Sequence, residues 1–103
     1  MGGIMASPVY NLTLHCTYYF RGFFNLGVEV DKLVRPDNGE ITLFLGEGRR
    51  MIRGHVDRKA NRNGTPRIFG SGLLVWFKQN FQLMDRVDVV ILSPDLIWLK
   101  KPV

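Results

Sequence analysis

The sequence predicts a small, mainly β domain, built as a mostly antiparallel barrel of about seven short strands with one clear helix. Three observations lead to this fold class. Apolar and polar residues alternate over much of the chain, as they do in strands with one buried face. Clusters of Gly, Pro, Asn and Asp separate these segments at short intervals. Apolar residues at helical spacing occur in one segment only.

The first third of the chain predicts two strands around an aromatic-rich segment. Tyr10, Leu12 and Leu14 alternate with polar residues and predict the first strand. Residues 17–25 (TYYFRGFFN) follow, and a second strand should run from residue 23 or 24 to residue 30. The turn sequence PDNG then closes a connection over residues 31–37.

The middle of the chain predicts a hairpin and a loop. Residues 40–45 (EITLFL) form a strand, GEG makes a short turn, and residues 49–57 return as the partner strand. Residues 60–66 form a loop, because Asn61, Asn63 and Gly64 tolerate a positive φ. A short strand resumes at residues 67–69.

The last third predicts the helix and two further strands. The helix covers residues 70–80, with Ser71 as its N-cap and an apolar face that includes Leu73, Leu74, Trp76 and Phe77. A turn at residues 81–85 leads into a strand rich in β-branched residues at 87–92. A last short strand is predicted at residues 96–99.

Length and composition favour one folded domain over residues 8–103, with residues 1–7 (MGGIMAS) as a vector-derived or disordered start. The single cysteine, Cys16, excludes an internal disulfide and is expected to be buried and inert. No apolar run approaches the roughly 20 residues that a membrane-spanning helix needs. The sequence therefore predicts a protein of the cytoplasm without a membrane partner.

Positive charge is concentrated in residues 49–67 (RRMIRGHVDRKANRNGTPR). This segment has seven of the fourteen Lys and Arg against one acid, a net +6, and the other 84 residues have seven cations against eight acids, a net −1. Phosphate contacts must converge to add up, so a clustered charge favours a nucleic-acid partner more than the overall +5 does.

The order of segments near the C-terminus is similar to a known family. Residues 66–99 (PRIFGSGLLVWFKQNFQLMDRVDVVILSPDLIWL) resemble the second half of the B-three type pseudobarrel DNA-binding domain. This family includes plant transcription-factor domains and the effector domains of EcoRII- and BfiI-type restriction endonucleases. Its pattern is a short strand, a Gly, a helix with a Trp-Phe pair, a Gly-Asp turn and a β-branched strand. Trp76 and Phe77 fit this pattern, and Met84 stands where the Gly is usual.

The resemblance implies a seven-stranded open pseudobarrel with one or two short helices that grips the major groove of double-stranded DNA with two arms. By position, the first arm is residues 17–25 and the second is residues 53–67, which coincides with the basic segment. Residues 17–25 are similar to the prokaryotic branch. The chain is then the recognition domain of a restriction endonuclease, or a small stand-alone relative, in the cytoplasm or at the nucleoid. It is not expected to be an enzyme, because catalysis would reside in a fused or separate nuclease domain.

Cationic and amide side chains in the two arms are the candidate DNA contacts. Arg can donate two hydrogen bonds to guanine O6 and N7, Asn can pair with adenine, and Lys or Arg can neutralise phosphates. No catalytic residue, metal or small-molecule cofactor is expected, because one Cys and two distant His do not make a zinc site. The predicted DNA-binding residues are Arg21, Asn25, Arg53, Arg58, Lys59, Asn61, Arg62, Asn63 and Arg67.

Two other functions remain open from the sequence. Asp37 after Pro36, followed by Asp57 and Lys59, satisfies the PD…(D/E)xK spelling of magnesium-dependent nucleases, in which two acids and a Lys converge on a metal. The spelling is short, and Asp37 lies in a turn sequence that explains itself. The same barrel could instead be an RNA- or protein-binding module.

Overall fold

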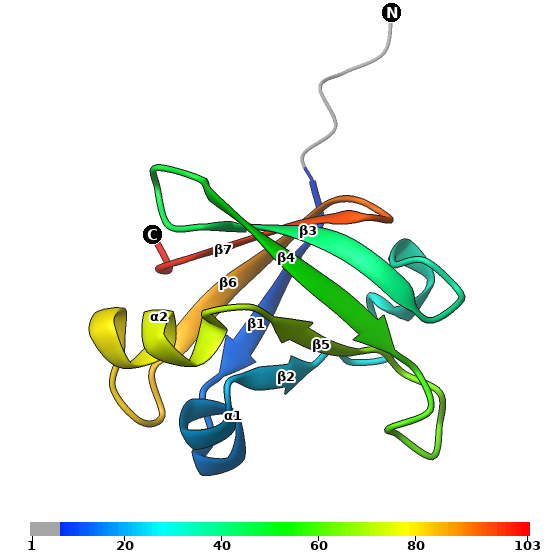
Figure 1. The fold of residues 1–103 in the computed structure, drawn as a ribbon, viewed down its shortest axis with the longest axis horizontal. Helices are drawn as coiled ribbons and strands as arrows, with labels where there is room; N and C mark the ends of the chain where they lie inside the picture. The colour runs from blue at the N-terminus through cyan, green and yellow to red at the C-terminus, as the bar shows by residue number, and fades with distance from the viewer. Residues whose placement is uncertain (1–6) are drawn as a thin grey trace, which may run out of the picture.

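The computed structural model describes residues 7–103 as one curled sheet with two short helices (Figure 1). The predicted start at residues 1–7 lies almost wholly outside the described part of the chain. The strands are β1 (Val9–Thr13), β2 (Phe23–Asn25), β3 (Gly39–Leu45), β4 (Arg50–Asp57), β5 (Arg67–Gly70), β6 (Arg86–Ser93) and β7 (Leu96–Lys100); the helices are α1 (Cys16–Arg21), α2 (Leu73–Asn80) and the 3-10 turn η1 (Asp31–Leu33).

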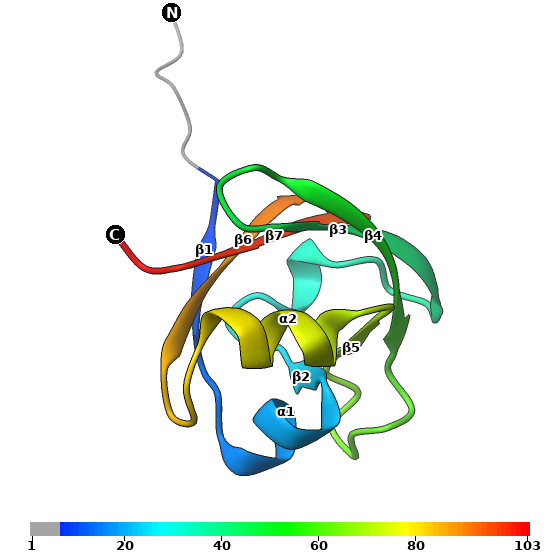
Figure 2. The ribbon, with the colours of Figure 1, turned by 60° about the vertical axis from the view of Figure 1, so that its left-hand side comes forward.

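The seven strands form a single sheet in the order β1-β6-β7-β3-β4-β5-β2. All neighbouring strands are antiparallel except β3 and β7, which are parallel. The sheet curls so that β1 and β6 lie on one side, β7 and β3 across the top, and β4 on the other side (Figure 2). The edge strands β1 and β2 are linked along the chain through α1. The sheet is therefore an open pseudobarrel, as the sequence predicts.

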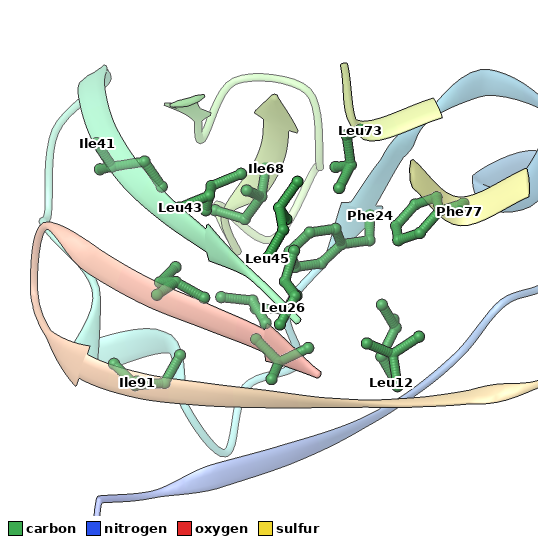
Figure 3. Close-up of a cluster of buried hydrophobic side chains, with 14 of the residues drawn as sticks. Leu12, Phe24, Leu26, Ile41, Leu43, Leu45, Ile68, Leu73, Phe77 and Ile91 are labelled. Atoms are coloured by element: carbon green, nitrogen blue, oxygen red, sulfur yellow. The ribbon is translucent and has the colours of Figure 1, made fainter. Parts of the chain in front are cut away.

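Alternation along the strands supplies the core of the barrel. On β3, for example, Ile41, Leu43 and Leu45 are buried while the residues between them are partly exposed. Phe24 of β2 and Phe77 of α2 are fully buried in the same cluster (Figure 3). The predicted core role of Trp76 and Phe77 is confirmed.

Helix α1 lies at the start of the first predicted arm, where the sequence pattern predicted no helix. Gly22 ends this helix in the left-handed conformation (φ 74°), and its N–H donates to the carbonyl oxygen of Tyr18 at 2.8 Å. The hydroxyl of Tyr19 donates to the carbonyl oxygen of Phe81 at 3.4 Å and links α1 to the end of α2. With six residues and no buried member, α1 has too short an apolar face for its period to be recognised.

Three smaller predictions are wrong. Strand β2 ends at Asn25 rather than near residue 30, because the chain turns after Leu26 into η1. The N-cap of α2 is Gly72 (φ 88°) and not Ser71, whose N–H instead donates to the carbonyl oxygen of Arg53 at 2.9 Å. Cys16 is exposed at the start of α1 rather than buried.

The turn at residues 81–85 contains a residue under backbone strain. Met84 has φ 73°, a conformation that side chains with a Cβ rarely adopt, and it is more than half exposed. Its N–H donates to the carbonyl oxygen of Leu14, and the N–H of Leu14 donates to that of Asp85, both at 2.8 Å. This pair of bonds holds the turn against the end of β1 and leaves Met84 no freedom to relax.

Candidate nucleic-acid interface

Strand pairing brings the two predicted arms onto one outer surface of the barrel. Strand β2, at the end of the first arm, pairs with β5, which in turn pairs with β4 of the second arm. Phe24, Ile68 and Val56 point into the core, so their neighbours along each strand point outward. Figure 1 shows β2 and β5 between α1 at one end and the β4–β5 loop at the other. The outward residues are Phe23 and Asn25 on β2, Arg67 and Phe69 on β5, and Arg53, His55 and Asp57 on β4.

A polar network joins the arms at the loop end of this surface. The Oδ1 atom of Asn25 accepts hydrogen bonds from Nδ2 of Asn61 and from Nε of Arg67, both at 3.0 Å. The Nη2 atom of Arg67 also donates to Oδ1 of Asn61 at 3.2 Å. The guanidinium of Arg67 lies 4.6 Å from the centroid of the Phe23 ring. Three predicted contact residues are therefore held together, with Nη1 of Arg67 free of protein acceptors within residues 7–103.

Arg58 has a different role from the one predicted. Its side chain is 16% exposed and donates to the carboxylate of Asp31 and to four backbone carbonyl oxygens. All five N–H donors of the guanidinium are thus used inside the protein. The acceptor carbonyls belong to Asp31, Val34, Arg35 and Gly64. Arg58 fixes the β4–β5 loop to η1 and has no donor left for a nucleic acid.

The tip of the β4–β5 loop presents the exposed cations Lys59 and Arg62. Asn63 shapes the loop, because its Oδ1 accepts from the N–H of Thr65 at 3.2 Å and from its hydroxyl at 2.7 Å. The side-chain NH₂ of Asn63 takes no part in these bonds. In the described chain, the Lys59 and Arg62 side chains form no ion pair or hydrogen bond, so they remain available to an external anion.

An open groove of about 500 Å³ lies at the other end of the surface, between α1 and β4. Arg21, at the end of α1, and Arg53, on β4, both line it. Gly54 and Gly70, which are cross-strand partners, also line it, and a side chain at either position would point toward Leu43 in the core rather than into the groove. The two arginines are exposed and unpaired among the contacts of residues 7–103.

Aromatic rings line the same groove and were not predicted as site residues. The ring of His55 stacks on that of Phe69, with centroids 4.7 Å apart and planes 11° apart. Phe69 in turn packs against Phe23 at 5.4 Å. The sequence contained the pattern that places these two residues. His55 immediately precedes the core residue Val56, and Phe69 immediately follows the core residue Ile68, each in a predicted strand. Their alternation with Val56 and Ile68 places them on the outer face.

A second groove of about 500 Å³ runs along the other side of the polar network. Four of the predicted residues line it: Asn25, Asn61, Arg62 and Asn63. Of the nine predicted contacts, six therefore line one of the two grooves, Arg67 joins the polar network, Lys59 is exposed on the loop tip, and Arg58 is mostly buried. The basic residues Arg49 and Arg50 lie at the opposite end of β4, where Arg49 stacks 4.1 Å from the centroid of Trp98.

The acids of the alternative nuclease spelling each accept hydrogen bonds within the chain. Asp37 accepts two hydrogen bonds from Arg35, at 3.0 and 3.2 Å, and these bonds lower the pKa of the Asp37 carboxyl. The Oδ1 atom of Asp57 accepts from the backbone N–H of Lys59 at 2.9 Å. No group of three or more His, Cys, Asp or Glu suited to a metal ion occurs among residues 7–103.

Comparison with known proteins finds no matching family model, curated relative or solved structure. Among the described helices, neither the length nor the apolar character needed to cross a bilayer is found.

Proposed function

We propose that the protein binds double-stranded DNA, with the two arms gripping the major groove and a few side chains selecting a short sequence. One observation carries this proposal. The β2–β5 pairing and the bonds among Asn25, Asn61 and Arg67 make one rigid surface from two segments that are far apart in the chain. That surface is edged by exposed cations at both ends, which suits the phosphate backbone on either side of a groove.

The environments of the cations suggest how contacts divide between phosphates and bases. Lys59 and Arg62 stand on an exposed loop tip, where a flexible point charge is sufficient for a phosphate. Arg67 is oriented by Asn25 and Phe23 and keeps donors free, which suits bidentate contact with guanine. Arg21 and Arg53 face a common groove and are the DNA contacts at that end of the surface.

The order of elements supports assignment to the B-three type of pseudobarrel. The chain has β5, a glycine, a helix with a buried Trp-Phe pair, a tight turn and the β-branched strand β6 in the family order. Met84 adopts a positive φ where the family has Gly, so this backbone position has the conformation for which Gly is suited. On this assignment the chain is a prokaryotic recognition domain, of the cytoplasm or nucleoid, with any nuclease activity in another domain or protein.

The proposal is tested by selection from a random duplex library at several salt concentrations, with magnesium in half of the samples. We expect one short motif to be enriched and the DNA to stay intact. Lys59→Ala should weaken binding to all DNA sequences alike and reduce the slope of log affinity against log salt concentration by about 1. Arg67→Ala should instead cost about 1–3 kcal/mol of binding free energy at one base pair only. Arg50→Ala, at the far end of β4, is the matched control and should change affinity least.

Three outcomes would contradict the proposal. Substitutions in both arms that leave affinity unchanged would exclude this surface. Cleavage that requires magnesium and is lost in Asp57→Ala would favour the nuclease. Stronger competition by RNA than by duplex DNA would favour the RNA-binding alternative on the same barrel.

A further inference from the structure

The groove between α1 and β4 has an aromatic face that a fully paired duplex cannot use. His55 is exposed, and Phe69 covers one face of its ring. Phe69 belongs to β5, on one side of β4, and the residue opposite His55 on the other side is Glu40 of β3. The uncovered face of His55 therefore points toward Glu40, and no other aromatic ring contacts it within the described chain. A flat ring placed there would continue the Phe69–His55 stack.

The polar groups around this face include both hydrogen-bond donors and an acceptor. Arg53 lies two residues before His55 on the same face of β4, and Arg21 reaches the groove from α1. Glu40 lines the groove as an exposed carboxylate, and its side chain forms no ion pair in the structure of residues 7–103. Guanidinium groups donate only, and a carboxylate accepts only.

Among the bases, guanine matches this set most fully. Its O6 and N7 accept from an Arg, while its N1–H and N2 amino group donate to a carboxylate. These atoms include the Watson–Crick edge, which is free only when the base is unpaired. The second arginine remains for the adjoining phosphate. The groove volume of about 500 Å³ lies within the range of volumes that is usual for small-molecule binding sites.

We infer that this groove binds a single unpaired guanine of a DNA duplex, stacked on His55, with Glu40 and Arg53 on its edge and Arg21 on its phosphate. The inference rests on the proposed function, because it takes DNA as the partner. It adds that the protein prefers a duplex with one extrahelical guanine over the same duplex fully paired.

The test measures fluorescence anisotropy of otherwise identical labelled duplexes that carry no bulge or a single bulged G, A, T or C. We expect the bulged G duplex to bind about 5- to 150-fold more tightly than the paired one, from the usual strength of base–aromatic stacking. His55→Ala should remove this preference, measured as the ratio of the affinities for the bulged G duplex and the paired duplex. Glu40→Gln should keep the preference for a bulge but reduce the discrimination of G from the other bases.

His15→Ala is the matched control, since His15 is exposed and lies outside the groove. It should behave as the parent protein. Equal affinity for paired and bulged duplexes would overturn the inference and leave the proposed function standing. Failure to bind any of the duplexes would overturn both, and tighter binding of a bulged RNA than of the bulged DNA would overturn the DNA assignment.

Discussion

Arg58 is the side chain whose loss should damage the fold most among the residues of the basic segment. Arg58→Ala would remove one donor each from the Asp31 carboxylate and from four backbone carbonyl oxygens. Because buried polar groups that lose a charged partner are costly, we expect a loss of about 2–4 kcal/mol in the free energy of unfolding. Chemical denaturation measures it.

The control for this change is Arg62→Ala, which removes an exposed guanidinium from the same loop and should stay within about 0.5 kcal/mol of the parent. If Arg58→Ala kept the stability of the parent protein but lost DNA affinity, Arg58 would be a DNA contact and its proposed structural role would be wrong.

Replacing Met84 with glycine should stabilise the folded protein. Its positive φ strains any residue with a Cβ, and its exposed side chain contributes little packing. After the larger backbone entropy of unfolded glycine is deducted, Met84→Gly should stabilise the protein by about 0.5–1 kcal/mol and raise Tm by about 2–6 °C. Calorimetry measures the change. Leu83→Gly, at the neighbouring exposed position without a positive φ, should destabilise the protein. A higher Tm in both variants would show that relief of backbone strain at Met84 is not the cause.

Residue roles were predictable where they depend on local pattern and not where they depend on distant backbone. Arg67 and Asn25 were assigned to the surface from composition and position in the arms, and pairing of β2 with β5 brings them together. The role of Arg58 depends on carbonyl groups of residues 31, 34, 35 and 64, which no side-chain pattern identifies. Charge alone cannot distinguish a contact arginine from a buried one.

At the scale of elements, the pairing of β4 with β5 depends on two facing glycines. A Cβ at Gly54 would lie 2.7 Å from the carbonyl oxygen of Phe69 and 3.0 Å from Cδ1 of Leu43. Gly54→Ala should therefore force the strands apart and lower the free energy of unfolding by about 1–3 kcal/mol. Gly48→Ala, where no atom lies within 4 Å of the added Cβ, should be close to neutral.

The same substitution has a second readout in the DNA-binding surface. Because Gly54 and Gly70 line the first groove, separation of β4 from β5 should also weaken binding to the selected DNA motif. Proton exchange of the β4 and β5 amides would locate the damage. Unchanged protection of these amides in Gly54→Ala would show that the strands accommodate the methyl group.

Strands were predicted better than the short helical segments. Strands β3, β4 and β6 contain enough alternating or β-branched residues for the local pattern to predict them. Each lies within a residue or two of its predicted position. Helix α1 and η1 are each under two turns, so their formation depends on what surrounds them. Tertiary contacts such as that of Tyr19 with Phe81 decide such segments.

At the scale of the whole molecule, a charge cluster in the sequence becomes two separate groups in space. Strand β4 is eight residues long and extends for roughly 24 Å, so Arg49 and Arg50 lie far from Lys59 and Arg62. A small barrel was predictable from the number of short strands, and its open form was implied by the family resemblance. Its strand order was not, because the parallel neighbours β3 and β7 are separated by most of the second half of the chain.

The position of β7 also governs how the molecule can assemble over time. Residues 96–100 are synthesised after every other strand, yet they lie in the middle of the sheet between β6 and β3. Until they emerge, β1 with β6 and the β3-β4-β5-β2 group have no common edge to pair along. Formation of the barrel is thus one late event governed by contacts distant in sequence, which is slow for a chain of this size. A nascent chain stalled before Leu96 would expose two half-sheets, each an aggregation risk that the finished protein does not have.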